Sequence, residues 1–152
     1  MIDFSKLGKV KLGEIAPPPV EPQGTYHGTV RSWKWAESRW KNKETGQSEA
    51  QVHFTIKPTA FGEDVDEAER EVFEASAKLS DKIHVAEVGV QSGAQVYYMQ
   101  ELLRGLGIDI AGKDLDEALP NVVGSSVQYN VVHRDGERGT IVNIRKLRPL
   151  IA

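Results

Sequence analysis

The alternation of apolar and polar side chains in residues 51–57 restricts the fold of this chain more than any other feature. The alternating set is Val52, Phe54 and Ile56 against His53, Thr55 and Lys57. Successive side chains of a β-strand point to opposite faces, so a period of two predicts a strand with one buried and one exposed face. Pro58 cannot donate a hydrogen bond to a sheet, and we expect it to end this strand.

Four other segments carry strand signals. Residues 24–35 are rich in β-branched and aromatic side chains, and the polar residues 37–48 predict a loop after them. Near the C-terminus, Asp135-Gly136 is a strong signal for a hairpin between two strands. The predicted strands cover, in order, residues 24–35, 51–57, 82–88, 122–133 and 140–148.

The acidic segment 62–78 is predicted to be a helical insertion between strands two and three. Asp64 and Glu67 have the spacing of a capping box, in which side chains satisfy the first free N–H groups of a helix. Apolar residues recur behind them at roughly helical period: Val65, Ala68, Val72 and Ala75.

A second helix is predicted between strands three and four. Ser92 and Gln95 form another capping box, and Gly105 or Gly107 ends the helix. One face of it is apolar: Val96, Met99, Leu102, Leu103 and Leu106. A short turn is expected at 115–119, ended by Pro120.

The resulting order, β-β-β-α-β-β, matches the five-stranded barrel called the OB-fold. Residues 1–23 precede it and include three consecutive prolines at 17–19, which favour an extended polyproline conformation. We therefore expect a mainly β protein with an extended N-terminal arm over 1–23 and one OB-fold domain over 24–152.

Composition narrows the class of protein. Hydrophobic residues make up 39% of the 152 and charged residues 27%, which is typical of a globular cytosolic domain. No apolar run is long enough to span a bilayer, and the N-terminus does not resemble a secretory signal. The absence of cysteine excludes disulfides, thiolate metal sites and cysteine nucleophiles. We expect a cytoplasmic protein that does not contact membranes.

The net charge of −3 conceals an uneven distribution. Residues 62–119 carry 5 basic and 14 acidic side chains, whereas the rest of the chain carries 14 basic and 8 acidic. Local fields steer a charged ligand more than the net charge does. An anionic partner is therefore compatible with this sequence.

Aromatic and basic residues occur together around the first predicted strand. A groove for unpaired nucleic acid needs cations for the phosphates and flat rings on which bases stack. All three tryptophans lie in a basic stretch: Arg31, Trp33, Lys34, Trp35, Arg39, Trp40, Lys41 and Lys43. Strict alternation places Trp33 and Trp35 on the face opposite Tyr26, so they point outward if Tyr26 points inward. The alternative is that Trp33 and Trp35 are packing residues.

Further cations complete the predicted interface. His53 and Lys57 are expected on the outer face of strand two. A second basic cluster follows the last hairpin: Arg134, Arg138, Arg145, Lys146 and Arg148. Basic side chains also protect edge strands from aggregation, so this cluster has an alternative structural explanation. The acidic segment is best explained as a solvated helix face, with a partner-docking surface as the alternative.

Catalytic patterns are weak. Residues 107–113 have the glycine and lysine spacing of a phosphate-binding loop, but Asp114 replaces the Ser or Thr that binds magnesium. The histidines form no metal-binding motif. The acidic segment has the carboxylates of a metal-dependent nuclease but no paired lysine. We therefore expect no enzymatic activity and no cofactor.

Several segments together resemble phage-type single-stranded DNA-binding proteins. They are the proline-containing leader, residues 22–26, the 41–46 loop before residues 52–56, and the closing residues 141–147. The resemblance covers most of residues 20–148. It implies an OB-fold protein that coats unpaired DNA during phage replication or recombination, in the host bacterial cytoplasm. Many such proteins end in an acidic tail, whereas this sequence ends Arg148-Pro149-Leu150-Ile151-Ala152.

The leading hypothesis is a sequence-tolerant binder of single-stranded DNA. Replication or recombination proteins and further copies of the chain remain open as partners. The alternatives are an adaptor whose aromatic surface contacts protein, and a metal-dependent nuclease. The predicted contact residues are Arg31, Trp33, Lys34, Trp35, Arg39, Trp40, Lys41, Lys43, His53, Lys57, Arg134 and Arg138.

Overall fold

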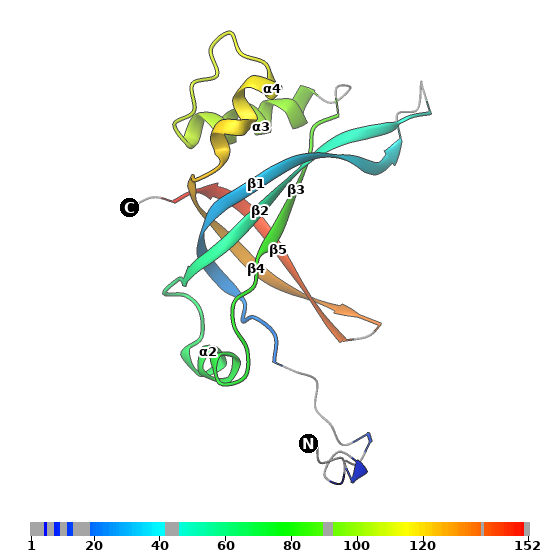
Figure 1. Cartoon of the computed structure of the whole chain (residues 1–152), viewed down its shortest axis with the longest axis vertical. Helices are drawn as coiled ribbons and strands as arrows, with labels where there is room; N and C mark the ends of the chain where they lie inside the picture. Colours follow the sequence, from blue (N-terminus) through cyan, green and yellow to red (C-terminus); the bar gives the residue numbers. More distant parts are fainter. Residues whose placement is uncertain are drawn as a thin grey trace.

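The computed structural model of the chain describes residues 5, 8, 9, 12, 13, 19–41, 46–89, 93–137 and 139–150, without the side chain of Trp40. The mainly β class is confirmed (Figure 1). The elements are β1 (Gly24–Lys41), β2 (Ser48–Phe61), α2 (Glu67–Glu74), β3 (Lys82–Glu87), α3 (Gly93–Gly105), α4 (Leu115–Ala118), the 3-10 helix η1 (Leu119–Val122), β4 (Ser126–Gly136) and β5 (Gly139–Pro149).

The five strands form one antiparallel sheet in the order β3-β2-β1-β4-β5. The sheet curls, and its edge strands β3 and β5 face each other across a groove lined by both. No ladder joins β3 to β5 in the part of the chain that the structure describes. Figure 1 shows α3 and α4 at one end of the curled sheet and α2 at the other, with the end of β1 and the end of β4 projecting to the right. No described helix is long and apolar enough to cross a membrane.

The core lies inside the curl of the sheet. Alternate residues of β1, β2 and β4 supply it, and α3 and η1 close it at one end. The rings of Tyr26 and Tyr129 stack at 5.8 Å between centroids, and burial raises the pKa of both phenols. The predicted inward face of residues 51–57 is confirmed, since all three apolar residues are fully buried: Val52, Phe54 and Ile56.

The first hairpin is longer than predicted. β1 continues to Lys41 and β2 begins at Ser48, so the expected loop at 37–48 was wrong for residues 37–41 and 48. Residues 46 and 47 lie in no strand, and 42–45 lie outside the described residues. Glu37 pairs with Ala50 and Lys41 with Ser48. This end of the hairpin projects beyond the core, so its pairing needs no alternation of apolar and polar residues.

Pro58 does not end strand two, because β2 runs on to Phe61. The ladder with β1 is irregular at this point: Gly28 pairs with Pro58, and the register shifts between Gly28 and His27. A bulge leaves some backbone groups unpaired, and there a residue without an N–H is tolerated.

The helical segments agree with the predictions only in part. α2 is shorter than 62–78, and its N-cap is Asp66, whose side chain accepts from the N–H of Glu69 at 2.9 Å. Asp64 instead accepts two hydrogen bonds from Thr25, at 2.8 and 2.9 Å. These bonds hold the pKa of Asp64 below its usual value. The predicted capping box was wrong because the side chain of Asp64, in the turn after Gly62, is hydrogen-bonded to Thr25 of β1 and not to the first turn of the helix.

α3 ends at Gly105 and buries Met99 and Leu103, in line with its predicted apolar face. Ser92 lies outside the described residues. Gln95 accepts a hydrogen bond from the N–H of Gly89 at 2.9 Å, and so ties α3 to the end of β3. Pro120 lies within η1 and does not end the preceding turn.

Gly28 is predicted to be intolerant of any side chain. A Cβ there would lie 2.7 Å from Cγ2 of Ile56 and 2.9 Å from the carbonyl oxygen of Lys57. Such overpacking costs roughly 1–3 kcal/mol, so Gly28→Ala should lower the free energy of unfolding by about that amount. Gly93→Ala is the control, because a Cβ at Gly93 contacts nothing within 4 Å. Denaturant unfolding of both variants measures the difference; equal stability would contradict the prediction.

Candidate nucleic-acid interface

The outer face of β1, β2 and β3 forms one surface, polar on β1 and β2 and partly aliphatic on β3. Directly opposed residues of an antiparallel ladder share a face. One row is Lys34, His53 and Val85, and the next is Ser32, Thr55 and Ile83. Lys57 follows Thr55 on the same face of β2 and is exposed. The predicted outward positions of His53 and Lys57 are therefore confirmed.

His53 belongs to a hydrogen-bonded chain on this face. Its Nε2 pairs with Oε1 of Gln51, and Nε2 of Gln51 donates to Oε1 of Glu87 at 2.9 Å. This chain fixes the imidazole in one orientation beside Lys34. His53 is half-buried, so only part of its side chain is accessible to a ligand.

The groove between β3 and β5 borders this surface. Its β3 wall runs from Asp81 to Val85 and its β5 wall from Val142 to Lys146. Ile83 and Val85 are 55% and 47% exposed, which is unusual for large aliphatic side chains. The groove thus offers apolar surface on one wall and the cations Arg145 and Lys146 on the other.

Lys146 has an unusual backbone conformation. Its φ is 56°, and no other described non-glycine residue has a positive φ. This left-handed region favours glycine, so a lysine here costs conformational energy. The register of β4 and β5 shifts at the same place, between Gln128 and Asn130. Strain of this kind often marks a site where the side chain has a function.

Four basic side chains of this region have no side-chain hydrogen bond or ion pair within the described ranges. They are Lys34, Lys57, Arg145 and Lys146. Unpaired cations are available to a ligand, since no internal ion pair must be broken first. Arg31 differs, because its guanidinium pairs with Asp81 at the start of the groove.

Trp33 and Trp35 do not point outward, and the prediction of their face was wrong. Arg31 is an extra residue in β1, between the pairs Val30↔Ile56 and Ser32↔Thr55. This bulge reverses the alternation, so Trp33 lies opposite Phe54 and Trp35 opposite Val52, both on the core face. Trp33 packs against the core, in agreement with the alternative prediction that it is a packing residue.

Trp35 is nevertheless 41% exposed, because its row lies at the edge of the core. Its Nε1 donates to Oδ1 of Asp116 at 3.0 Å and so links β1 to α4. The two indoles are in edge contact, with 6.1 Å between ring centroids. The carboxylate of Asp116 beside Trp35 disfavours a phosphate near this ring. The surroundings of the Trp35 indole thus differ from the cationic site that the sequence predicted.

The remaining predicted contact residues lie away from this surface or outside the described residues. Arg39 and Lys41 are exposed on the projecting end of β1, and Arg134 is exposed on β4 near the second hairpin. Trp40 belongs to β1, but its side chain is not described. Lys43 and Arg138 lie outside the described residues.

A buried ion pair anchors the segment before β1. Nζ of Lys82 lies 2.7 Å from Oε1 of Glu21, and both side chains are largely buried. Nε2 of His133 donates to the carbonyl oxygen of Glu21 at 2.6 Å. These contacts join β3 to β4 at the end of the groove away from α3. Residues 21–23 therefore pack as part of the domain, although they were assigned to the arm.

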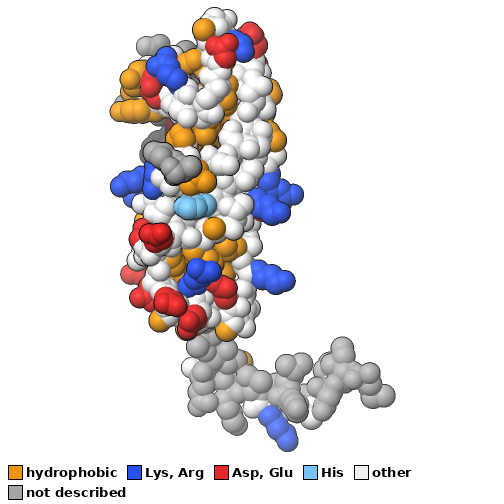
Figure 2. Space-filling view, turned by 90° about the vertical axis from the view of Figure 1, so that its left-hand side faces the viewer, with side chains coloured by type: hydrophobic (Ala, Val, Ile, Leu, Met, Phe, Trp, Pro, Cys, Tyr) orange, Lys and Arg blue, Asp and Glu red, His pale blue; other side chains and the backbone are white. Residues whose placement is uncertain are grey.

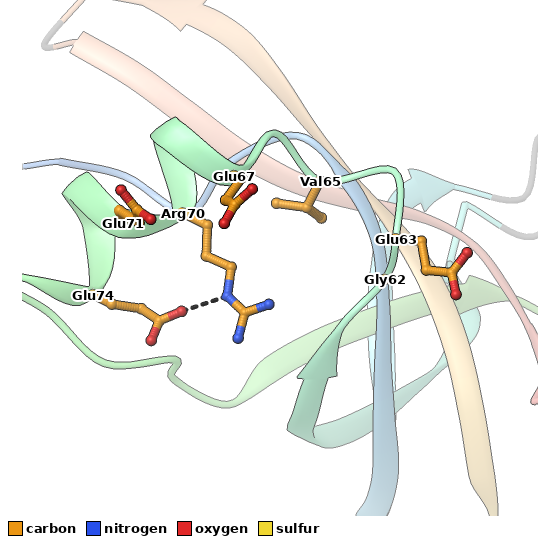
Figure 3. Close-up of a pocket in the computed structure, with 7 residues that line it drawn as sticks. All are labelled: Gly62, Glu63, Val65, Glu67, Arg70, Glu71 and Glu74. Carbon is orange, nitrogen blue, oxygen red and sulfur yellow. Dashed lines mark hydrogen bonds and ion pairs between the residues drawn. The ribbon is translucent and has the colours of Figure 1, made fainter.

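The acidic segment gathers carboxylates at the α2 end of the molecule, in the lower half of Figure 2. Figure 3 shows the hollow beside α2, where Arg70 turns toward Glu74 and forms an ion pair, while Glu63 points away from the helix. No group of three or more potential metal-ligating side chains occurs among the described residues. The structure thus gives the nuclease alternative no assembled ligand set.

Sequence reasoning missed the apolar part of the groove, Ile83 and Val85, although it noted Arg145 and Lys146 in a basic cluster. Alternation in residues 82–87 puts Ile83 and Val85 on one face of the strand and His84 on the other. In the structure the face with His84 is the more buried one, so the two aliphatic side chains are exposed. No protein-family model and no curated protein sequence matches the chain.

Proposed function

We propose that this chain is a sequence-tolerant single-stranded DNA-binding protein built on an OB-type barrel. The four unpaired cations on the outer sheet face and the adjoining groove carry the proposal. Phosphate contacts from lysine and arginine supply most of the affinity in sequence-independent binding. The barrel assignment is supported by the strand order, because β3 and β5 become neighbours when the sheet closes.

The groove fits a flexible single strand better than a duplex. Its walls are two strand edges, with Ile83 and Val85 facing the cations of β5. Unstacked bases can cover exposed aliphatic side chains while phosphates contact Arg145 and Lys146, whereas a duplex keeps its bases stacked inside. We extend the proposal, from the sequence resemblance, to phage replication or recombination in the host cytoplasm.

Titration of a labelled, unstructured oligonucleotide tests this function by fluorescence anisotropy. We expect binding that weakens steeply as salt is added, since each phosphate contact releases counterions. A duplex of the same length is the control and should bind more weakly. An anisotropy that does not change with any single-stranded oligonucleotide at low salt would refute the proposal and favour an adaptor that binds protein.

A further inference from the structure

Two neighbouring tyrosines on α3 stand out of the molecular surface. Tyr97 is 56% and Tyr98 70% exposed, more than any other aromatic side chain for which the structure gives an exposure. Their rings are in edge contact, 5.9 Å between centroids and inclined by 64°. Two large rings in water contribute nothing to the core, so a ligand is the simplest reason to keep them there.

The helix geometry places Tyr98 on the flank of α3 that faces the groove. Four residues recur at i, i+3, i+7 and i+10 and thus form one stripe of the helix: Gln95, Tyr98, Leu102 and Gly105. The first of them is hydrogen-bonded to Gly89, just beyond β3. The last lies against Pro149, the final residue of β5, where a Cβ on Gly105 would be 3.0 Å from Cγ of the proline.

This stripe therefore spans the end of the groove from one edge strand to the other. Tyr98 lies between the two attachment points, and Tyr97 supports it by edge contact. Both β3 and β5 run toward α3. A single-stranded DNA that contacts Arg145 and Lys146 and continues along the groove in this direction therefore meets α3 next. Arg104 and Glu101 form an ion pair on α3 itself, which adds no net charge beside the tyrosines.

We propose that Tyr97 and Tyr98 form a base-stacking platform for single-stranded DNA at the α3 end of the groove. This inference rests on the proposed function. Phosphates contact the cations of β5, and the unpaired bases that follow stack on the exposed tyrosine rings. Continuity with the unpaired cations is what favours a nucleic acid over a protein partner here.

The test compares the double variant Tyr97→Ala/Tyr98→Ala with Tyr97→Phe/Tyr98→Phe, which keeps both rings. Alanine favours an exposed helix, so the first variant should fold. Loss of stacking should weaken binding of a base-containing oligonucleotide about 10-fold to 100-fold, and the phenylalanine variant should bind like the wild type. An abasic oligonucleotide of the same length should bind the alanine variant and the wild type equally.

The outcomes separate the platform from the function. If the wild type binds DNA with normal salt dependence and the alanine variant binds equally well, the platform is refuted and the function stands. Equal weakening on the base-containing and abasic strands also refutes stacking, since it indicates a structural effect. If the wild type binds neither strand, the proposed function itself fails. Capture of a protein through the tyrosines, without DNA binding, would assign them to a protein interface.

Discussion

Replacing both cations of the β5 wall, in the double variant Arg145→Glu/Lys146→Glu, should weaken single-stranded DNA binding about 10-fold to 100-fold. Neither side chain has an internal partner among the described residues, so the change removes phosphate contacts without breaking an ion pair. Position 146 has a positive φ and carries a non-glycine residue both before and after the change, so the backbone strain there should stay the same. Oligonucleotide anisotropy at several salt concentrations measures both the affinity and its salt dependence.

The control is Lys9→Glu/Lys78→Glu, which changes the net charge by the same amount and also breaks no ion pair among the described residues. Neither lysine lines the groove between β3 and β5. If binding depends on the groove, this control should retain most of the affinity, and only the β5 variant should show a shallower salt dependence. Equal losses in the two variants would show that net charge, and not the groove, governs binding.

Acid should destabilise the protein through His84. This imidazole stacks on Phe54 on the inner side of β3, and burial lowers its pKa to about 4. An unfolded histidine titrates near 6.5, so between about pH 6.5 and pH 4 the unfolded chain binds more protons than the folded one. Above about pH 6.5 His84 is neutral in both states and causes no destabilisation, and the free energy of unfolding falls as the pH drops from about 6.5 to about 4. At about pH 5 the loss should be about 2 kcal/mol.

His84→Leu isolates this effect, because it removes the titrating group and leaves the other histidines in place. Urea unfolding of both proteins at about pH 7 and about pH 5 gives the two differences in free energy of unfolding. The wild type should lose more stability than the variant over this interval. Identical losses would show that His84 is protonated in the folded protein, contrary to its burial.

Local patterns predicted the strands well where one face is buried. The residues of β2 alternate because one side meets the core, and that is visible in the sequence. The projecting part of β1 buries no apolar side chain among its described residues, and the side chain it does bury, Ser38, is polar, so this part looked like a loop. Pro58 was misjudged for a related reason: tolerance of a proline depends on a bulge, and the ladder that creates the bulge involves residues about thirty positions away.

The candidate site was predicted less completely, because a single residue changed its geometry. The bulge at Arg31 cannot be seen from β1 alone, since it arises from the register with β2. It turned two predicted stacking rings to the core face. The unpaired state of Lys34 and Lys57, and the pairing of Arg31 with Asp81, also depend on contacts between strands. Tyr97 and Tyr98 were missed although neither belongs to the predicted apolar face of α3, because the position of that helix relative to the groove depends on its contacts with the ends of β3 and β5.

The contacts near the two ends of the groove affect how a polymer could enter it. α3 connects the edge strands at one end, and the Glu21 contacts connect β3 to β4 at the other. A groove with α3 at one end and the Glu21 contacts near the other is still open along its length and admits a chain from the side. Loading of this kind needs no free terminus, so a covalently closed single-stranded circle should be bound as readily as a linear strand of the same length.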